Sequence, residues 1–222
     1  SKVQKNLGYL PGEIAFMDDM TGTQFIRFVA AMKGLRDLSR AQRLQAFFEL
    51  DASGKIKKMS KGMKQKIGIV CAFMQDADTL ILDEPTSGLD PLMQNKFIEL
   101  ILREKQRGKT ILMSSHIFEE VEKTCDRAAI IRAGRIVTVK SMAALQAKRK
   151  KRITVLFSSV ANASAFAAAH PQSVLHDAAV TMPVADINTF LKALSPYPIL
   201  DITTHTQSLE ELFMHFYEED AQ

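Results

Sequence analysis

Two short, uninterrupted apolar runs constrain the fold of this chain more than any other feature. Residues 79–82 (TLIL) and 110–113 (TILM) have strand length, and each is followed by polar residues and then by a helix-like stretch. Strands that are apolar throughout are typical of parallel sheets covered on both faces. We therefore expect an α/β sheet from residue 79 onward, with a helix between the two strands that begins at Pro91 and ends at Gly108.

The residues before this sheet are expected to supply one more strand and a mostly helical region. The strand covers residues 5–10 and ends at Pro11-Gly12. Residues 18–75 then show the apolar spacing of helices. Three helices are expected there: one capped by Thr21 or Thr23 with Phe25, Phe28, Val29 and Met32 on its apolar side, one capped by Ser39, and one over residues 63–74.

The α/β region ends with a hairpin, and the last third of the chain then predicts a separate small fold. Residues 128–131 and 135–139 form a hairpin about Ala133-Gly134. After a basic run comes a β-α-β-β-α-β pattern, which matches a ferredoxin-like sandwich. Its expected strands are 152–158, 172–177, 179–184 and 198–204, its helices are 161–169 and 186–195, and a final helix runs from Ser208 to near Glu218.

Charge gives no argument for nucleic-acid binding. The chain has 29 Lys and Arg against 25 Asp and Glu, a net charge of +4, but residues 148–152 (KRKKR) are all basic. Without that run the chain is close to neutral, so its basic character is local. We expect no nucleic-acid partner, and we interpret the run as a solvated hinge rather than a specific anion site.

Membrane and secretion signals are also missing from the sequence. Residues 153–169 lack Asp, Glu, Lys and Arg, but three serines, an asparagine and strand-like alternation argue against a spanning helix. The first residues, SKVQK, do not resemble a signal peptide. Cys71 and Cys125 are isolated, without metal-ligand spacing, as in proteins of reducing compartments. We expect a soluble cytosolic protein.

Two adjacent acids follow the first apolar run, within LILDEPTSGLD over residues 80–90. The carboxyl end of a strand is where open α/β sheets bind ligands. Mg²⁺ prefers carboxylate and water oxygens, so Asp83 is a candidate ligand, directly or through water. Glu84 points differently and is a candidate for orienting a water that attacks a phosphoryl group. Taken alone, two acids at a strand end are common and are weak evidence.

Two further polar segments strengthen this interpretation. Ser60 and Gly62 precede an amphipathic helix in MSKGMKQK, residues 59–66. Ser60 can cap that helix, and Gly62 lets a bound anion approach backbone N–H groups at the positive end of the helix dipole. His116 follows two serines at the end of the second strand. Each of these features, by itself, has a common structural explanation: a plain N-cap before a surface helix, and a structural histidine, which is normally the better interpretation of a single histidine.

In this order, the motifs resemble those of the ATP-binding subunits of ABC transporters. Residues 83–85 and 87–90 resemble the Walker B segment and the D-loop. Residues 59–65 resemble the signature sequence, with Lys61 and Met63 at the usual Gly and Gln positions. His116 resembles the switch histidine, and residues 8–11 (GYLP) resemble the stretch before the Q-loop. The resemblance covers residues 1–140. The tail, with SLEELF at residues 208–213, is similar to the accessory domain of some export-type ATPases.

The resemblance implies a P-loop NTPase-like α/β domain over residues 1–147, its N-terminal part missing, with a parallel sheet and a helical subdomain at about 18–75. An α+β ferredoxin-like accessory domain would follow at residues 148–222. The implied cofactors are ATP and Mg²⁺. The implied partners are a transmembrane permease subunit, which docks on the helical subdomain, and a second ATP-binding subunit in a head-to-tail dimer. The protein would lie in the cytoplasm, peripheral on the inner face of the cell membrane.

The resemblance also implies a role for each motif residue in hydrolysis or in the dimer. Asp83 would serve Mg²⁺, Glu84 would polarise the attacking water, His116 would contact the γ-phosphate, Ser60 and Gly62 would reach the γ-phosphate bound on the opposite subunit, and Asp90 would lie at the dimer interface.

The sequence departs from the family at two points. Gly12 and Glu13 follow Pro11 where the family has its Q-loop glutamine, and Glu13 substitutes for it only if the loop shifts. No G-x-x-x-x-G-K-[S/T] occurs, so the phosphate-cradling loop is missing.

We therefore expect the C-terminal part of an ABC transporter ATPase, inactive on its own. Two alternatives stay open: an ABC-type ATPase that acts on another macromolecule, and a non-catalytic regulatory fragment that binds partners through residues 150–222.

Overall fold

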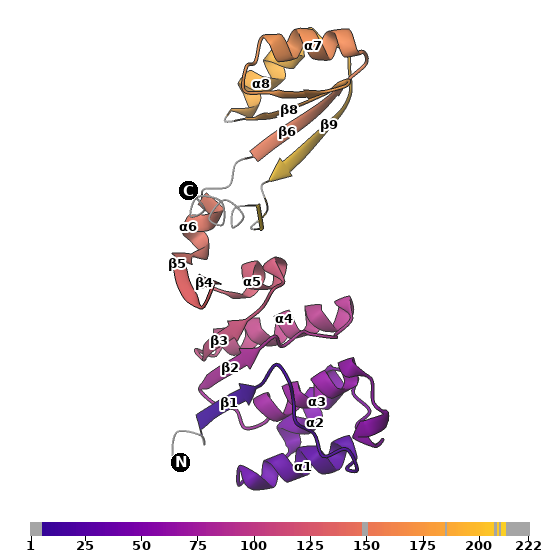
Figure 1. The fold of residues 1–222 in the computed structure, drawn as a ribbon, viewed down its shortest axis with the longest axis vertical. Helices are drawn as coiled ribbons and strands as arrows, with labels where there is room; N and C mark the ends of the chain where they lie inside the picture. Colours follow the sequence, from indigo (N-terminus) through magenta and orange to yellow (C-terminus); the bar gives the residue numbers. More distant parts are fainter. Residues whose placement is uncertain (1–5, 148–150, 185, 207, 209, 212–222) are drawn as a thin grey trace. The chain divides into compact units, whose positions relative to one another are not determined.

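A computed structural model describes residues 6–147, 151–184, 186–206, 208 and 210–211 (Figure 1). The chain divides into two compact units, residues 1–124 and 125–222. The first unit contains the parallel sheet and the helical region, and the second contains the hairpin and the ferredoxin-like fold. The domain boundary that the sequence suggests, at 147/148, stays a prediction; the compact units separate earlier, before the hairpin.

Three parallel strands form the sheet of the first unit. They are β1 (Leu7–Leu10), β2 (Thr79–Asp83) and β3 (Thr110–Ser114), in the order β1-β2-β3. β2 pairs with β3 in a register that places Asp83 opposite Ser114. The polar residues that follow β2 and β3 therefore meet at one edge of the sheet, as the sequence predicts.

One face of this sheet is packed and the other is open. Leu10 of β1 and Leu80 and Leu82 of β2 are buried in the core of the unit. On the opposite face Tyr9 and Leu112 are 54% and 65% exposed. The prediction that both faces are covered therefore holds for one face only within the described part of the chain.

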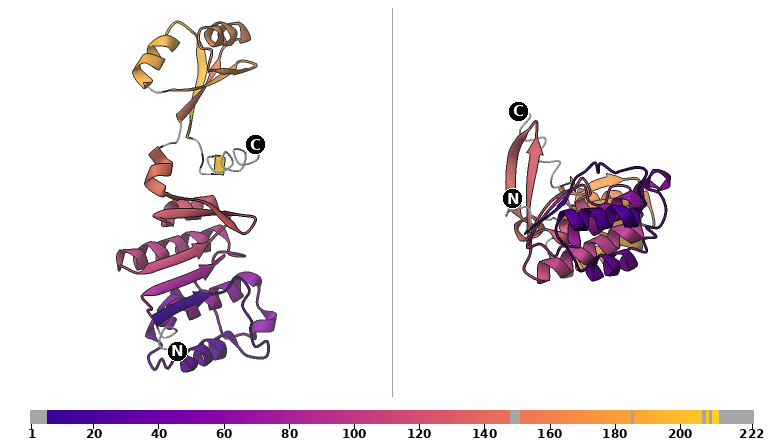
Figure 2. Two further views of the ribbon diagram at one scale, coloured as in Figure 1. Left: turned by 60° about the vertical axis from the view of Figure 1, so that its left-hand side comes forward. Right: turned by 90° about the horizontal axis from the view of Figure 1, so that it is seen from below.

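The helical region consists of α1 (Gly22–Met32), α2 (Ser39–Phe47), the 3₁₀ helix η2 (Ile56–Lys58) and α3 (Lys61–Phe73). Figures 1 and 2 show these helices gathered beside β1. Thr21 caps α1 in a capping box with Gln24, so the first of the two predicted caps is used. α3 is almost entirely buried beyond its first turn and carries the core of the region.

Two details of the predicted helical region are wrong. Ser39 is not a cap: Leu38 precedes α2 without a side-chain cap, and the Ser39 hydroxyl donates to Asp37 instead. Met32 is 73% exposed, because Ile26 and Ala30 form the buried side of α1.

The helix between β2 and β3 is α4 (Pro91–Gln106), and α5 (Phe118–Thr124) follows β3. Asp90 caps α4 by accepting from the Met93 amide at 3.0 Å, and Pro91 occupies its first turn. Gly108 follows the C-terminus of α4 with a φ of 81°, a left-handed conformation that glycine adopts without a Cβ penalty. Both predicted ends of this helix are confirmed.

The second unit begins with the predicted hairpin. β4 (Arg127–Arg132) and β5 (Arg135–Ser141) pair in antiparallel fashion, and α6 (Met142–Ala147) follows. The turn residues Ala133 and Gly134 both have positive φ, as in a type I′ turn, which suits the twist of a two-stranded hairpin.

The rest of the second unit has the predicted β-α-β-β-α-β order. Its elements are β6 (Lys151–Phe157), α7 (Val160–Ala168), β7 (Val174–His176), β8 (Ala179–Pro183), α8 (Ile187–Leu194) and β9 (Ile199–Thr206). The strand order β7-β8-β6-β9 is antiparallel throughout, and α7 and α8 cover the same face (Figures 1 and 2). Phe157 and Phe166 pack against each other within its core, with their ring centroids 5.2 Å apart. Most of the predicted helix at 208–218 and most of the basic run lie outside the described residues.

No helix in the described ranges is both long enough and apolar enough to cross a membrane.

Candidate functional site

Ser114, the last residue of β3, lies at the centre of a cluster of polar groups at the carboxyl edge of the sheet. Its hydroxyl donates to Asp83 Oδ1 at 2.5 Å and accepts from the Glu84 amide at 3.0 Å. A single hydroxyl thus fixes the carboxylate at the end of β2 and the backbone at the start of the following loop. The pairing of Asp83 with Ser114 in the sheet register makes this contact possible.

Glu84 and His116 come from the loops after β2 and β3 and face each other. Nδ1 of His116 lies 2.6 Å from Oε2 of Glu84, and their side chains are 73% and 35% exposed. Glu84 has a φ of 44°, in the left-handed region that costs free energy for a residue with a Cβ. Strain of this kind at a polar strand end is common at functional sites. The two side chains form an open, solvent-accessible pair of potential proton donor and acceptor.

The N-terminus of α3 lies against the loop that follows β2. Ser60 caps α3 by accepting from the Met63 amide at 3.2 Å. A Cβ added to Gly62 would lie 2.8 Å from the Gly88 carbonyl oxygen, so only glycine fits at this approach. Gly62 thus lies against the 84–90 loop. The sequence predicted a glycine that lets an anion approach the backbone, and it did not predict this contact.

Gln65 is a polar residue of this site that sequence reasoning missed. It lies one turn into α3, is 5% exposed, and its Nε2 donates to the carbonyl oxygens of Glu84 at 3.3 Å and Pro85 at 2.8 Å. These bonds tie α3 to the backbone of the residue that faces His116. The sequence offers little signal for this, because Gln65 stands between two lysines, although a buried amide needs partners.

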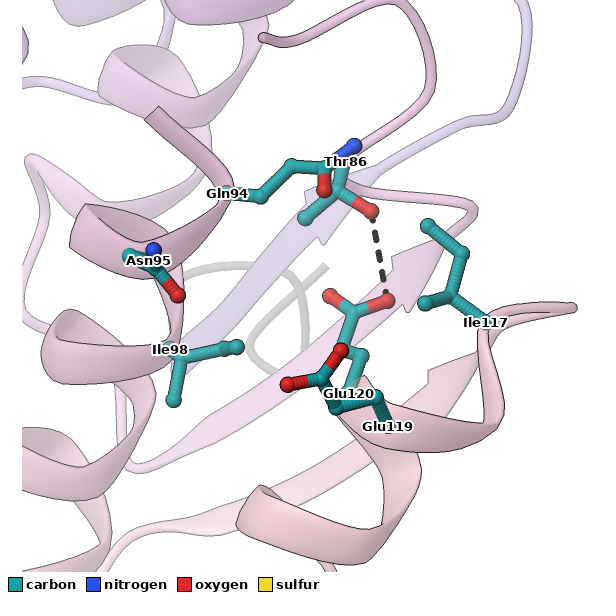
Figure 3. A pocket seen from close by; sticks show the side chains of 7 residues that line it. All are labelled: Thr86, Gln94, Asn95, Ile98, Ile117, Glu119 and Glu120. Atoms are coloured by element: carbon teal, nitrogen blue, oxygen red, sulfur yellow. Dashed lines mark hydrogen bonds between the residues drawn. The ribbon is translucent and has the colours of Figure 1, made fainter. Parts of the chain in front are cut away.

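Glu120 of α5 is the second missed residue. It is 3% exposed, and its Oε2 accepts from Thr86 Oγ1 at 3.2 Å and from Ser115 Oγ at 2.6 Å. Burial raises the pKa of this carboxyl, while the hydrogen bonds from Ser115 and Thr86 act in the opposite direction. Glu120 borders a small cavity of about 40 Å³. Figure 3 shows the side chains that line it: Thr86, Gln94, Asn95, Ile98, Ile117, Glu119 and Glu120.

The segment after β1 also reaches this edge of the sheet. A Cβ added to Gly12 would lie 2.9 Å from Asp83 Oδ2, so the backbone at Gly12 passes close to the carboxylate. Glu13 is exposed. Gly12 therefore lets the backbone pass close to the Asp83 carboxylate, and it offers no side chain as a ligand.

The donor set at this edge suits Mg²⁺ in one respect. Asp83 offers carboxylate oxygens beside a hydroxyl, and Mg²⁺ is commonly bound by one or two carboxylates together with waters and substrate phosphates. No group of three or more His, Cys, Asp or Glu that could hold a metal occurs among the described residues. Asp83 fits a magnesium ion that takes its other ligands from a bound phosphate and from water. Cys71 is buried in the core of the first unit, and burial raises the pKa of its thiol to about 12.

Sequence comparisons match the region that carries this site. A family model described as "AAA domain, putative AbiEii toxin, Type IV TA system" matches residues 38–122. The ABC transporter ATP-binding protein NatA of Bacillus subtilis is 32% identical over 170 residues, which are 72% of this chain and 68% of NatA. An ABC transporter ATP-binding protein of Synechocystis is 34% identical over 149 residues, 64% of this chain.

Solved structures give the same picture for the fold. An ATP-binding subunit of an ABC transporter has 30% identity and a TM-score of 0.59, over 66% of this chain and 63% of that chain. A dimeric ATP-binding cassette bound to ADP and Pi has 19% identity and a TM-score of 0.57, over 64% of this chain and 65% of that chain, which speaks to the fold alone. The chain spans only 42% of the Synechocystis relative.

Proposed function

The chain belongs to the family of ABC transporter ATP-binding proteins, and on that premise we propose that the intact protein binds and hydrolyses ATP to drive transport through a separate membrane subunit. The observation that carries the proposal is the contact between Glu84 and His116 at the ends of two neighbouring parallel strands. A carboxylate and an imidazole in contact can hold a water and a phosphoryl oxygen on the same side of a reacting phosphate.

We assign each side chain one task in this proposal. Asp83 holds Mg²⁺, which would neutralise charge on the phosphates. Glu84 accepts a hydrogen bond from the attacking water and polarises it. His116 donates to an oxygen of the γ-phosphate, and its contact with Glu84 orients the imidazole. These tasks need groups that water and phosphate can reach, and both side chains of the pair are partly exposed.

The dimer and the membrane partner are part of the same proposal. Ser60 and Gly62, at the N-terminus of α3, would contact the γ-phosphate bound by a second ATP-binding subunit, and Asp90 would lie at the interface between the two. The position of Ser60 supports this, since it is exposed at the N-terminus of α3, where backbone N–H groups and the helix dipole favour an anion. The helical region at 18–75 would dock on the permease, with the protein on the cytoplasmic face of the membrane.

The 222 residues alone are proposed to be inactive. They contain no G-x-x-x-x-G-K-[S/T] sequence to cradle the phosphates of ATP. A tight, magnesium-dependent affinity of this chain for ATP would contradict that part of the proposal.

The test is ATP turnover in the protein extended by the family's upstream segment, comparing the parent with Glu84→Gln. Loss of the carboxylate should lower kcat by at least about 100-fold, the scale of general base catalysis. Glu119→Gln is the matched control, because Glu119 lies near the same edge but pairs with Lys123. Unchanged turnover in Glu84→Gln would remove Glu84 from the mechanism.

A further inference from the structure

One buried carboxylate oxygen joins the two loops that carry Glu84 and His116. Oε2 of Glu120 accepts hydrogen bonds from two hydroxyls. One belongs to Thr86, two residues after Glu84, and the other to Ser115, next to His116. The Ser115 hydroxyl also accepts from the Ile117 amide at 3.0 Å. The carboxylate therefore binds a side chain from each loop at a point close to the residue that each loop presents.

The two hydrogen bonds do not satisfy the whole carboxylate. Its other oxygen, Oε1, is buried without a hydrogen-bond partner among the described residues. A buried acid with an unsatisfied oxygen costs stability, and a well-packed apolar residue would avoid that cost. Stability alone therefore does not explain a glutamate at position 120. Holding the two loops together does, because it requires an acceptor that reaches both hydroxyls.

We propose that Glu120 is a positioning residue, which keeps the loops after β2 and β3 in the arrangement that brings Glu84 into contact with His116. This inference rests on the proposed function, because it assigns Glu120 an effect on the same pair. Glu120 itself does not contact the reacting groups. It acts through Thr86 and Ser115.

The geometry suggests a conservative variant that separates bridging from charge. Because both hydroxyls donate to the same oxygen, the carbonyl oxygen of a glutamine can take the place of Oε2 and keep both bonds. Glu120→Gln therefore retains the bridge without the charge, and Glu120→Ala removes both. Thr86→Val and Ser115→Ala each remove one side of the bridge and leave Glu120 in place. Glu119→Ala is the matched control on the same helix, since Glu119 pairs with Lys123.

The experiment measures kcat and KM for ATP in the protein with its upstream segment. Glu120→Ala should lower kcat about tenfold or more with KM changed less than about twofold, because small misplacements of reacting groups cost rate. Glu120→Gln should stay within about threefold of the parent. Thr86→Val and Ser115→Ala should each lower kcat less than Glu120→Ala, and neither should lower it further when combined with Glu120→Ala.

Hydrogen exchange in the 222-residue chain gives a readout that does not depend on turnover. Glu120→Ala should speed exchange of the Ser87 and Ile117 amides, which bond within the two loops, and leave the amides of β2 and β3 protected. Glu120→Gln should not speed it.

Four outcomes would overturn the proposal. If Glu84→Gln abolishes turnover but Glu120→Ala does not lower kcat, the proposed function stands and the positioning role is wrong. If Glu120→Gln is as slow as Glu120→Ala, the charge and not the bridge matters. Unchanged turnover in both Glu84→Gln and Glu120→Ala removes the proposed function together with this inference. Should Glu120→Ala fail to fold, Thr86→Val and Ser115→Ala decide, and parental kcat in both contradicts the bridge.

Discussion

The acidic side chains near the two ends of β2 have different kinds of partner. Near its amino end, Asp76 and Glu104 share three cations, Arg40, Arg107 and Lys109, with Glu104 at 2.7 Å from Arg40 and 2.8 Å from Lys109. At its carboxyl end, Asp83, Glu84 and Glu120 bond to serine and threonine hydroxyls and to His116, and no ion pair with a lysine or arginine is found for them among the described residues.

The pKa shifts follow this difference. Hydrogen bonds from Arg107 hold the pKa of the Asp76 carboxyl well below its usual range, against burial. Burial of Glu104 acts to raise the pKa of its carboxyl, but hydrogen bonds from Lys109 and Arg40 lower it overall. For Glu120 burial prevails, and the pKa is raised. The acids near the amino end are thus compensated by cations, whereas Glu120 is buried with hydroxyl partners only, among the described residues.

The largest effect should come from removing the carboxylate that we propose binds Mg²⁺. Asp83→Asn in the protein with its upstream segment should lower magnesium-dependent ATP turnover by at least about 100-fold, because the metal contributes several kcal/mol of charge stabilisation. Asp78→Asn, at the other end of the strand, should stay near the parent rate. Equal rates for Asp83→Asn and the parent would show that this carboxylate is not needed.

Breaking the compensated cluster should instead cost stability. Glu104→Ala should lower the free energy of unfolding of the chain by about 3 kcal/mol, because three cations lose a buried partner. Urea unfolding measures this. A loss below about 0.5 kcal/mol would mean that the cluster is no more than a set of screened surface ion pairs.

Asp76→Asn should have a smaller effect, about 1 kcal/mol at pH 7, because Asp76 is partly exposed and water screens its ion pairs. Its lowered pKa means that the unfolded state binds the proton first as the pH falls. The difference between parent and variant should therefore be full above about pH 4 and shrink below it. A difference that grows on acidification would contradict the ion-pair origin.

Glu120 should show the opposite pH dependence with the smallest amplitude. Its raised pKa means that the folded state holds the proton more tightly than the unfolded state. Relative to Glu120→Gln, the parent should be most stable near and below about pH 4 and lose stability as the pH rises through the folded-state pKa. Unfolding measured at several pH values checks this sign, and a parent that gains stability over the variant as pH rises would contradict it.

The sequence predicted the features that depend on residues close together in the chain. Asp83 directly follows one apolar run and His116 follows the two serines after the next, so their place at one edge of the sheet was predictable. Pro91 and Gly108 mark the two ends of a helix through local chemistry. Ser39 was a wrong cap because Asp37, two residues earlier, takes its hydroxyl.

The missed residues depend on contacts between distant segments. Gln65 reaches Pro85 20 residues away, and Glu120 reaches Thr86 34 residues away. Spacing along a helix shows that such a residue is buried or exposed, but not which loop its polar atoms meet. The hydrogen bonds of Glu120 to Thr86 and Ser115 depend on the pairing of β2 with β3, which brings the two loops side by side.

Under the proposed function, the exposed acids at the carboxyl end of β2 serve catalysis and those near its amino end serve stability. Urea unfolding of the 222-residue chain carrying Glu84→Gln or Glu104→Gln separates these two roles. Glu84 is partly exposed and strained, with a φ of 44°, so Glu84→Gln should leave the free energy of unfolding within about 0.5 kcal/mol of the parent. Glu104→Gln should lower it by about 2 kcal/mol or more. Equal losses in the two variants, or a larger loss for Glu84→Gln, would contradict the account.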